Sequence, residues 1–400
     1  MNKLSIIYNQ SLTQVQGINY VNNSFVMGCN YFKENGIVLD KIFSPTEVFG
    51  CVGKNRLDLI GSNIGSASYA RVRKLRTILK IALSSDYLMG ASIKLYFNYY
   101  RSAKKAVKRY LANGEESDYI LFQDAFSAYY FNKYNRTGKP KTALLLHCSN
   151  EPLEQMRPSF KGVFGKKWFG KLVDSHVAAA IDSVDKVIYL SDLAVRNSSV
   201  SGSKKTYIYN GVEDYPIGEI NAPQDIINVV TVGSVIEHKG QHLVIEALGL
   251  MAPNERKRYH YHVIGNGDYL PYCKELVAKF GLEDNVTFYG ARNNVAELLK
   301  DKDVFILPSR SEGMPMSIIE AMRQGLFILG TKTGGIPEMI TLDYGRLITR
   351  NPKDIVSILF SLYDEHLISK NNKEKSRQRY CECFSLKKMI NSYSSVFNSL

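Results

Sequence analysis

Residues 303–340 read DVFILPSRSEGMPMSIIEAMRQGLFILGTKTGGIPEMI. The apolar run 303–307 predicts a buried strand, and the Gly- and Pro-containing turn after it predicts a loop. A helix is expected to begin near Met316 and to end at Gly325, which suits the position after a helix. Pro315 suits the first helical turn. A strand, a loop and a helix in this order place the loop at the carboxyl edge of a parallel sheet, where α/β folds bind ligands.

Two carboxylates lie on either side of this helix start, Glu312 in the loop and Glu320 inside the helix. Ionised carboxylates accept hydrogen bonds and donate none, which suits sugar hydroxyls. The free N–H groups of a helix start, together with the helix dipole, favour phosphate oxygens. The arrangement therefore fits a nucleotide-sugar. Taken alone, the two acids are more typical of a capping residue and a surface residue, so the neighbouring motifs decide.

Three glycine-containing loops support the nucleotide-sugar interpretation. A strand predicted to end at Gly233 leads to a second helix start at Lys239, whose ammonium can reach phosphate as a point charge. Gly265 and Gly267 follow another predicted strand, where a flat base could approach the backbone closely. Gly334 begins a further glycine loop. Each motif alone is also typical of a surface turn.

Short apolar or β-branched runs alternate with helical patterns along the chain, which predicts two successive parallel sheets flanked by helices. The runs lie at 4–8, 37–43, 119–122, 142–146, 186–190, 206–209, 227–232, 260–264, 286–289, 303–307 and 326–329. The segment 213–225 contains Pro and Gly without periodicity, so we expect it to link a domain at 1–212 to one at 226–384.

Length and composition are those of a globular protein with two domains. The chain has 400 residues, of which 45% are hydrophobic. No apolar run approaches the 18 or so residues of a membrane-spanning helix, and the N-terminus is typical of a first strand, which predicts a cytoplasmic location. The six cysteines are scattered without metal-binding spacing, so free thiols and no metal are expected.

The positive charge is concentrated in the first half of the chain. The net charge is +13, and residues 1–218 hold 29 Lys and Arg against 17 Asp and Glu. Residues 66–112 contain a single acid and the basic residues Arg71, Arg73, Lys74, Arg76, Lys80, Lys94, Arg101, Lys104, Lys105, Lys108 and Arg109. Helical spacing predicts one apolar face made of Ile93, Tyr96, Tyr100, Ala103, Val107 and Tyr110. A solvated helix face and a membrane-surface helix both fit this stretch. Nucleic-acid binding ranks last, because no nucleic-acid motif accompanies the charge.

Residues 229–340 resemble the C-terminal domain of glycosyltransferase family 4, the retaining enzymes of GT-B fold that use nucleotide-sugars. The resemblance rests on ordered pieces: G-x(5)-K-G, G-x-G, V-x-F-x-G, D-V-x-x-x-P-S-x-x-E-G-x-P-x-S-x-x-E-A-M and G-G-I-x-E. The first half resembles the family more weakly. Residues 210–213 (NGVE) look like its hinge signature, His147 stands where the family has a sugar-contacting histidine, and Gly17 stands near its phosphate glycines.

The resemblance implies roles for these residues. Glu320 would bind the ribose, Glu312 the donor sugar, Lys239 the departing diphosphate, and His147 the donor sugar from the opposite domain. These last three would form the catalytic set. The donor site would comprise Gly17, Gly233, Ser234, Lys239, Gly265, Gly267, Arg310, Glu312, Gly313, Met314, Pro315, Met316, Ser317 and Glu320. A structural histidine at a strand end remains the alternative for His147.

The sequence departs from the family at Ser234, where an arginine usually follows the first glycine. Since the departing diphosphate needs positive charge, either Arg310 or His238 replaces that arginine, or the enzyme is slow or inactive. Gly17 is also single rather than paired.

The expected protein is therefore an α/β, GT-B enzyme with two Rossmann-like domains across a cleft. By the resemblance, helix 385–400 would pack back on the first domain. The expected reaction moves a sugar, with retention, from a nucleoside diphosphate-sugar such as a UDP-sugar to a saccharide acceptor, and neither metal nor cofactor is expected. A lipid-linked acceptor of cell-surface polysaccharide or lipopolysaccharide, reached by peripheral attachment to the anionic inner membrane face, would explain the basic first half. The alternatives are a nucleotide-sugar epimerase of the same fold and a catalytically silent nucleotide-sugar-binding partner.

Overall fold

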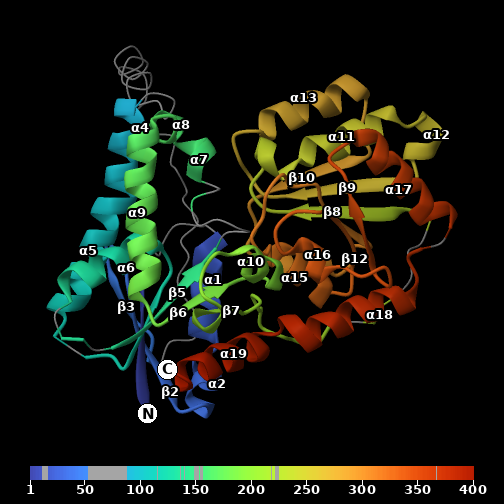
Figure 1. Ribbon diagram of the computed structural model, residues 1–400. Coiled ribbons are helices and arrows are strands. Elements are labelled where there is room, and N and C mark those ends of the chain that lie inside the picture. Colours follow the sequence, from blue (N-terminus) through green and yellow to red (C-terminus); the bar gives the residue numbers. More distant parts are fainter. Residues whose placement is uncertain are drawn as a thin grey trace. The chain divides into compact units, whose positions relative to one another are not determined.

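The chain divides into two compact units in the computed structural model (Figure 1). The structure describes residues 1–400 except 11–16, 53–87, 115, 136, 139, 148–152, 154–155, 218, 221–224 and 366. The first unit comprises Met1–Ile208 and Met389–Leu400, and the second comprises Tyr209–Lys388.

The first unit is built on a seven-stranded sheet of order β3-β2-β1-β4-β5-β6-β7, parallel except for the pair β2 and β3. Its strands are β1 (Asn2–Ile7), β2 (Ile37–Phe43), β3 (Val48–Gly50), β4 (Tyr119–Phe122), β5 (Lys141–Leu146), β6 (Lys186–Tyr189) and β7 (Lys205–Tyr207). Its helices are α1 (Gly17–Met27), α2 (Cys29–Glu34), α4 (Leu88–Leu95), α5 (Arg101–Ala112), α6 (Ala125–Tyr134), α7 (Met156–Ser159), α8 (Lys161–Phe164), α9 (Lys167–Ser183) and α10 (Asp192–Asn197), with a 3-10 turn at Gly202–Lys204.

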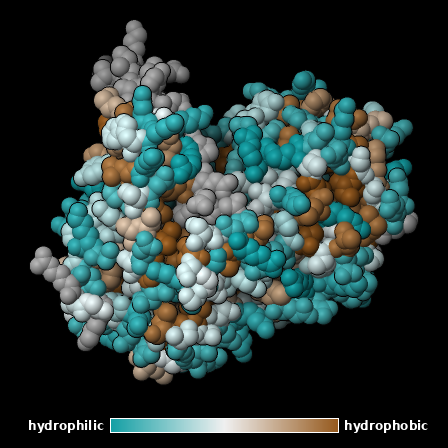
Figure 2. Space-filling view, in the orientation of Figure 1, coloured by the Kyte–Doolittle hydropathy of each residue, from teal (hydrophilic) through white to brown (hydrophobic). Residues whose placement is uncertain are grey.

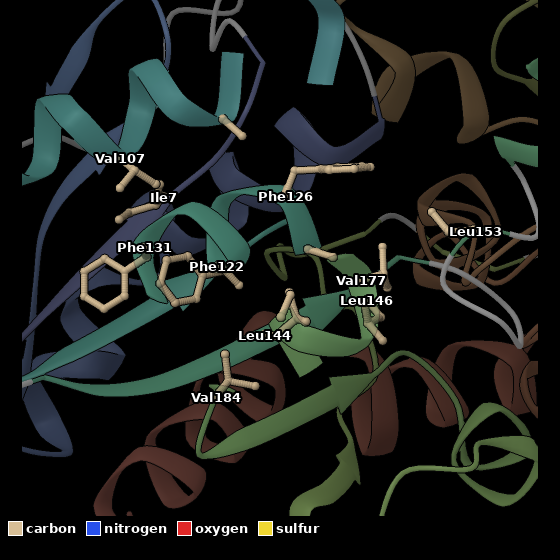
Figure 3. Packing of buried hydrophobic residues seen from close by; sticks show 14 of the residues in the cluster. Ile7, Val107, Phe122, Phe126, Phe131, Leu144, Leu146, Leu153, Val177 and Val184 are labelled. Atoms are coloured by element: carbon tan, nitrogen blue, oxygen red, sulfur yellow. The ribbon is translucent and has the colours of Figure 1, made fainter. Parts of the chain in front are cut away.

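The core of the first unit forms where the strands meet α5, α6 and α9. Phe122 of β4 and Leu144 of β5 are fully buried beside Phe131 of α6 and Val107 of α5 (Figure 3). Strands covered on both faces need continuous apolar runs, and every residue of β4 is buried. The end of the last helix, α19 (Leu386–Asn398), packs in this unit, since the ring of Tyr393 meets that of Phe25 edge-on at 4.9 Å.

A π-helical turn, Tyr96–Tyr100, separates α4 from α5 and changes which residues are buried. Ala103, Val107 and Tyr110 are buried as predicted, but Ile93 and Tyr96 are 37% and 52% exposed. The predicted single apolar face is therefore wrong over its first half. A π-turn holds one residue more than an α-turn, so it rotates the preceding helix relative to the following one.

The second unit has a six-stranded parallel sheet of order β10-β9-β8-β11-β12-β13. Its strands are β8 (Ile227–Val232), β9 (Tyr259–Ile264), β10 (Val286–Gly290), β11 (Val304–Leu307), β12 (Phe327–Thr331) and β13 (Gly345–Ile348). Its helices are α11 (Gln241–Leu250), α12 (Pro253–Arg256), α13 (Leu270–Phe280), α14 (Val295–Leu299), α15 (Met316–Arg323), α16 (Ile336–Met339), α17 (Pro352–Asp364) and α18 (Lys370–Arg379), with a 3-10 turn at Glu237–Lys239 and a π-turn at Tyr380–Phe384. Figure 1 shows α11, α13 and α17 on one face of the sheet and α15, α16 and α18 on the other.

Both sheets reverse their strand order once, between β1 and β4 in the first unit and between β8 and β11 in the second. At such a switch point the loops after the two strands diverge to opposite faces and leave a crevice where α/β folds bind ligands. Two parallel-sheet Rossmann-like units confirm the predicted α/β class. All eleven predicted strands are present, and β3 and β13 were not predicted.

The chain passes from the first unit to the second between Ile208 and Tyr209, before the expected linker at 213–225 begins. Within that segment, the Arg377 guanidinium donates to the Asp214 carboxylate over 2.6 Å, and that of Arg323 donates to the Glu213 carbonyl over 2.8 Å. These residues are thus bonded to helices of the second unit. None of the described helices combines the length and the apolar character that a bilayer crossing requires.

Candidate functional site

The switch point of the second unit brings Lys239 and Glu312 together. Lys239 closes the 3-10 turn after β8, and Glu312 lies in the loop after β11. The Lys239 ammonium donates to Oε1 of Glu312 over 2.6 Å, and the two side chains are 22% and 10% exposed. The sequence placed these residues on two separate strand ends, and the structure joins them as an ion pair.

Backbone-to-backbone packing between the loops explains two of the glycines. Gly334 has φ +54°, and a Cβ there would lie 1.8 Å from the carbonyl oxygen of Glu312. Gly265 would place a Cβ 1.8 Å from the carbonyl oxygen of Gly233. Only glycine fits such contacts. Gly265 and Gly267 thus serve to pack against the loop 233–235, a contact that the sequence pattern did not indicate.

Helix α15 points its N-terminus at the loop that carries Glu312. The helix begins at Met316, and Pro315 precedes it in an extended conformation with ψ 118°. Pro315 is therefore the residue before the first helical turn rather than part of it. No side chain caps this end, and the first N–H groups of a helix have no partners inside the helix. Ser317 is the second helical residue and is half-buried.

Glu320 lies in the second turn of α15 and is half-buried. Burial raises the pKa of its carboxyl above the ordinary range, and the nearby Arg323 guanidinium opposes part of this shift. The carboxyl therefore takes up a proton more readily than an exposed glutamate does.

Neither residue expected to replace the missing arginine is an unengaged cation. The Arg310 guanidinium donates to Glu237 over 3.1 Å, and its side chain is 62% exposed. Burial lowers the pKa of His238, so its imidazole is neutral near pH 7. Ser234 is exposed, and its carbonyl accepts a bond from the Gln241 amide over 2.9 Å.

Arg350, which sequence reasoning missed, and Asn210 hold the site loops. The Arg350 guanidinium donates to the carbonyl of His238 over 3.0 Å and also to that of Pro308, so it joins the loops after β8 and β11. The buried Asn210 amide donates to the carbonyl of Met314 over 3.1 Å, which fixes the segment before α15. The NGVE signature marked Asn210, but nothing in the sequence indicated its partner.

His147 lies in the first unit, directly after β5. Its Nε2 is 2.5 Å from Oε1 of Gln123, whose amide nitrogen donates to Oδ1 of Asn22 over 3.0 Å. Because Gln123 presents an oxygen, Nε2 carries the proton and Nδ1 is left as an acceptor. Burial lowers the pKa of His147 to about 4, so the ring is neutral at pH 7.

The remaining predicted residues are divided between the units. Gly17 is the first residue of α1, and the loop 11–16 before it lies outside the described residues. The carbonyl of Gly313 accepts a bond from the N–H of Gly335 over 2.7 Å, and Met314 is buried. The second unit therefore gathers the predicted diphosphate and sugar residues, whereas His147 and Gly17 belong to the first.

Comparisons with known proteins agree with this architecture. Residues 217–379 match the profile of a family described as glycosyl transferases group 1. The chain is 26% identical over 229 residues to the O-antigen biosynthesis glycosyltransferase WclY of Escherichia coli, covering 54% of this chain and 62% of that protein. It is 29% identical over 180 residues to the N,N'-diacetylbacillosaminyl-diphospho-undecaprenol alpha-1,3-N-acetylgalactosaminyltransferase of Campylobacter jejuni, covering 43% and 46%.

The fold extends over the whole chain. The Anabaena protein Alr3699/HepE, solved in complex with UDP, superposes with a TM-score of 0.68 at 15% identity, covering 100% of both chains. The predicted GT-B fold is thereby confirmed. The chain spans 32% to 62% of the length of the curated relatives that it matches.

Proposed function

We propose that the chain is a retaining glycosyltransferase that moves a sugar from a nucleoside diphosphate-sugar to a saccharide acceptor. The observation that carries the proposal is the Lys239–Glu312 pair, 2.6 Å apart, beside the uncapped start of α15 at a switch point. An ammonium and open N–H groups suit a diphosphate, and a carboxylate suits sugar hydroxyls.

In this proposal, the diphosphate lies at the N-terminus of α15 with Lys239 beside it. Glu312 accepts bonds from hydroxyls of the transferred sugar, and Glu320 accepts them from the ribose. The bond between the anomeric carbon and the phosphate oxygen breaks, and the acceptor oxygen forms a bond to that carbon on the same face. The acceptor proton passes to the departing phosphate oxygen, so no carboxylate nucleophile is needed.

Lys239 would be the cation that meets the developing charge of the departing diphosphate. Arg310 is paired with Glu237, and His238 is neutral, so both contribute less positive charge than an unpaired arginine would. This supports a slower enzyme than one with arginine at position 234, and it favours the silent binding partner as second candidate. No metal or cofactor is part of the proposal.

His147 would contact the donor sugar from the first unit. Its neutral ring with an unprotonated Nδ1 suits a hydroxyl donor rather than a phosphate, because an imidazole nitrogen without a proton accepts hydrogen bonds.

We further propose a lipid-linked acceptor at the anionic inner face of the membrane. The relative from Campylobacter jejuni acts, by its name, on a diphospho-undecaprenol sugar. The net charge of the first half of this chain supports the same location, since each basic residue near an anionic leaflet contributes about 1 kcal/mol. WclY, by its name, acts in O-antigen biosynthesis, which supports a role in cell-surface polysaccharide synthesis.

The proposal is tested in two steps. A thermal-shift panel of UDP-, GDP- and ADP-sugars identifies the donor, because binding to the folded state raises the melting temperature. Release of nucleoside diphosphate is then measured with and without bacterial lipid extract. A transferase releases it only when acceptor is present, an epimerase alters the sugar without acceptor, and a silent partner binds without turnover.

The matched variants are Glu312→Gln and the surface change Glu283→Gln, since Glu283 is exposed. We expect the first to weaken donor binding and the second to leave it unchanged. Equal donor affinity in the two variants would contradict the site assignment.

A further inference from the structure

Exposed aromatic and apolar side chains gather on two helical segments of the first unit. The exposed fractions are 63% for Met89, 37% for Ile93, 52% for Tyr96, 49% for Phe97, 64% for Trp168 and 45% for Leu172. The first four belong to α4 and the π-turn, and the last two to the first half of α9. We name these six side chains the aromatic surface. Figure 2 shows brown and white atoms among the teal ones over the part of the first unit where Figure 1 places α4 and α9.

The two segments meet where the π-turn ends. The Tyr100 hydroxyl is 2.7 Å from Nδ1 of His176, which links the end of the π-turn to α9. Leu172 and Trp168 precede His176 by four and eight residues, so they share its face of α9. Tyr96 precedes Tyr100 by about one turn in the same way. Helix α8, directly before α9, packs against α4 at the same end (Figure 1).

Exposed basic residues lie on α8 and α9, and one lies beside the π-turn. Lys161, Lys166, Lys167 and Lys171 are exposed. The Arg101 guanidinium lies 5.2 Å from the centroid of the Phe97 ring.

Acidic residues are nearly absent from the same segments. Residues 88–112 contain no acid, and residues 156–176 contain only Asp174. The Asp174 carboxylate accepts a bond from the Arg157 guanidinium over 2.7 Å. The charge facing any partner of the aromatic surface is therefore positive.

We propose that the aromatic surface enters the interfacial layer of an anionic lipid bilayer, with the lysines of α8 and α9 at the phosphate level. Contiguous exposed apolar area marks an interaction site. Amphipathic tryptophan and tyrosine rings beside lysines are the chemistry of interfacial helices. Complementarity of charge selects an anionic surface. The inference deepens the proposed function, on which it rests for its biological setting, because it identifies which face of the first unit meets the membrane.

The chain offers a site-specific reporter, because Trp168 is its only tryptophan. On addition of vesicles containing phosphatidylglycerol, we expect a blue shift of the Trp168 emission, protection from aqueous acrylamide, and quenching by lipids brominated on the acyl chain. Vesicles of phosphatidylcholine alone should give none of these. Co-sedimentation with anionic vesicles while the Trp168 emission stays unchanged would overturn the proposal, since another surface would then bind.

Matched variants separate this surface from general charge. The triple variant Lys166→Gln, Lys167→Gln, Lys171→Gln should lose about a hundredfold in binding to anionic vesicles. The control Lys257→Gln, Lys274→Gln, Lys353→Gln removes the same charge from exposed positions of the second unit and should bind as the parent does. Equal losses in both triple variants would overturn the proposal.

A third variant tests the apolar contribution. Leu172→Ser with Phe97→Ser should weaken vesicle binding at least tenfold, whereas Leu250→Ser, at a position 56% exposed in the second unit, should not. Nucleotide-sugar affinity, measured without lipid, should be equal in all these variants. A chain that binds no nucleotide-sugar but inserts Trp168 would contradict the proposed function alone, and the reverse result would contradict this inference alone.

Discussion

Replacing Glu312 with glutamine should distinguish two interactions of the Lys239 ammonium, one with the Glu312 carboxylate and one with the donor diphosphate. In the unliganded protein, this ammonium donates to the Glu312 carboxylate over 2.6 Å, with the carboxylate side chain 10% exposed. In the proposed complex, the diphosphate takes the ammonium and the sugar hydroxyls take the carboxylate. Glu312→Gln therefore removes a competitor for Lys239 and, at the same time, an acceptor for the sugar.

The magnitudes of the two effects follow from the burial of the pair. Breaking a buried ion pair costs about 3–5 kcal/mol, and we expect about 3 kcal/mol of unfolding free energy here because Lys239 is 22% exposed. A hydrogen bond to a charged group contributes about 1.5–3 kcal/mol. Losing the bond from a sugar hydroxyl should therefore weaken nucleotide-sugar binding by roughly 10- to 100-fold. Free nucleoside diphosphate should bind as tightly as before, or up to about tenfold tighter.

Calorimetry gives one dissociation constant for the free nucleoside diphosphate and one for the nucleotide-sugar. A change in the folding stability of a variant affects both constants alike, so it cancels in their ratio. We expect this ratio to move against the sugar by at least about tenfold in Glu312→Gln and to stay constant in Glu283→Gln. Adding Lys239→Met to both completes a double-mutant cycle that measures the coupling of the pair. An unchanged ratio in Glu312→Gln would refute the reasoning, because the carboxylate would then have no contact with the sugar.

Three further results are expected. Burial raises the pKa of Glu320, so its ionisation destabilises the fold as pH rises through that pKa. Glu320→Gln should therefore make the protein more resistant to urea at pH 7.5 and should lose this advantage near pH 4. A difference between variant and parent that does not depend on pH would contradict this prediction. Gln123→Glu should place a carboxylate at Nε2 of His147 and raise the pKa of the ring from about 4 by roughly 1–3 units, observed by NMR titration of the imidazole; an unmoved titration would show that the Gln123 contact does not persist in solution. Gly334→Ala should displace the Glu312 loop and abolish donor binding. The control Gly290→Ala, at a position with φ +69° and nothing within 4 Å of its Cβ, should lose only about 1 kcal/mol of stability. Equal donor affinity in both variants would contradict the role given to loop packing.

The sheets could be predicted from the sequence because their strands are buried on both faces. Runs such as VFIL in β11 and YILF in β4 carry the apolar continuity of a covered parallel strand. The two missed strands lack it. β3 has three residues at an edge and pairs antiparallel, and β13 (GRLI) has Arg346 half-buried and Leu347 44% exposed. An edge strand keeps one side open, so its composition approaches that of a loop.

The sequence could predict where the loops of the site lie, but not which side chains pair there. Glycines, Pro315 and the acids indicated loops at strand ends, and those loops are where the sequence put them. The partner of each charge depends on how two loops approach. Arg350 lies after the last piece of the motif, and Glu237 occupies a variable position of the piece G-x(5)-K-G, so the pattern marks neither. The same limit applies to the first unit, where a π-turn of five residues changed which side of α4 is exposed.

The ion pairs of the donor site and the exposed side of α4 bear on one question. It is how the proposed enzyme would work with Ser234 in place of an arginine. A site with one engaged lysine binds a diphosphate less strongly than a site that also has an unpaired arginine, because each charge-assisted bond adds about 1.5–3 kcal/mol. An enzyme held on a membrane surface meets a lipid-linked acceptor at a much higher local concentration than in solution, in the manner of an intramolecular encounter. By holding the enzyme on the membrane, the exposed aromatic residues and lysines of α4, α8 and α9 would raise the local concentration of acceptor. The higher acceptor concentration would offset the weaker binding of the donor diphosphate. Arginine introduced at position 234 should accordingly increase turnover most with a soluble acceptor and least on vesicles, and an equal increase in both settings would show that the two features are unrelated.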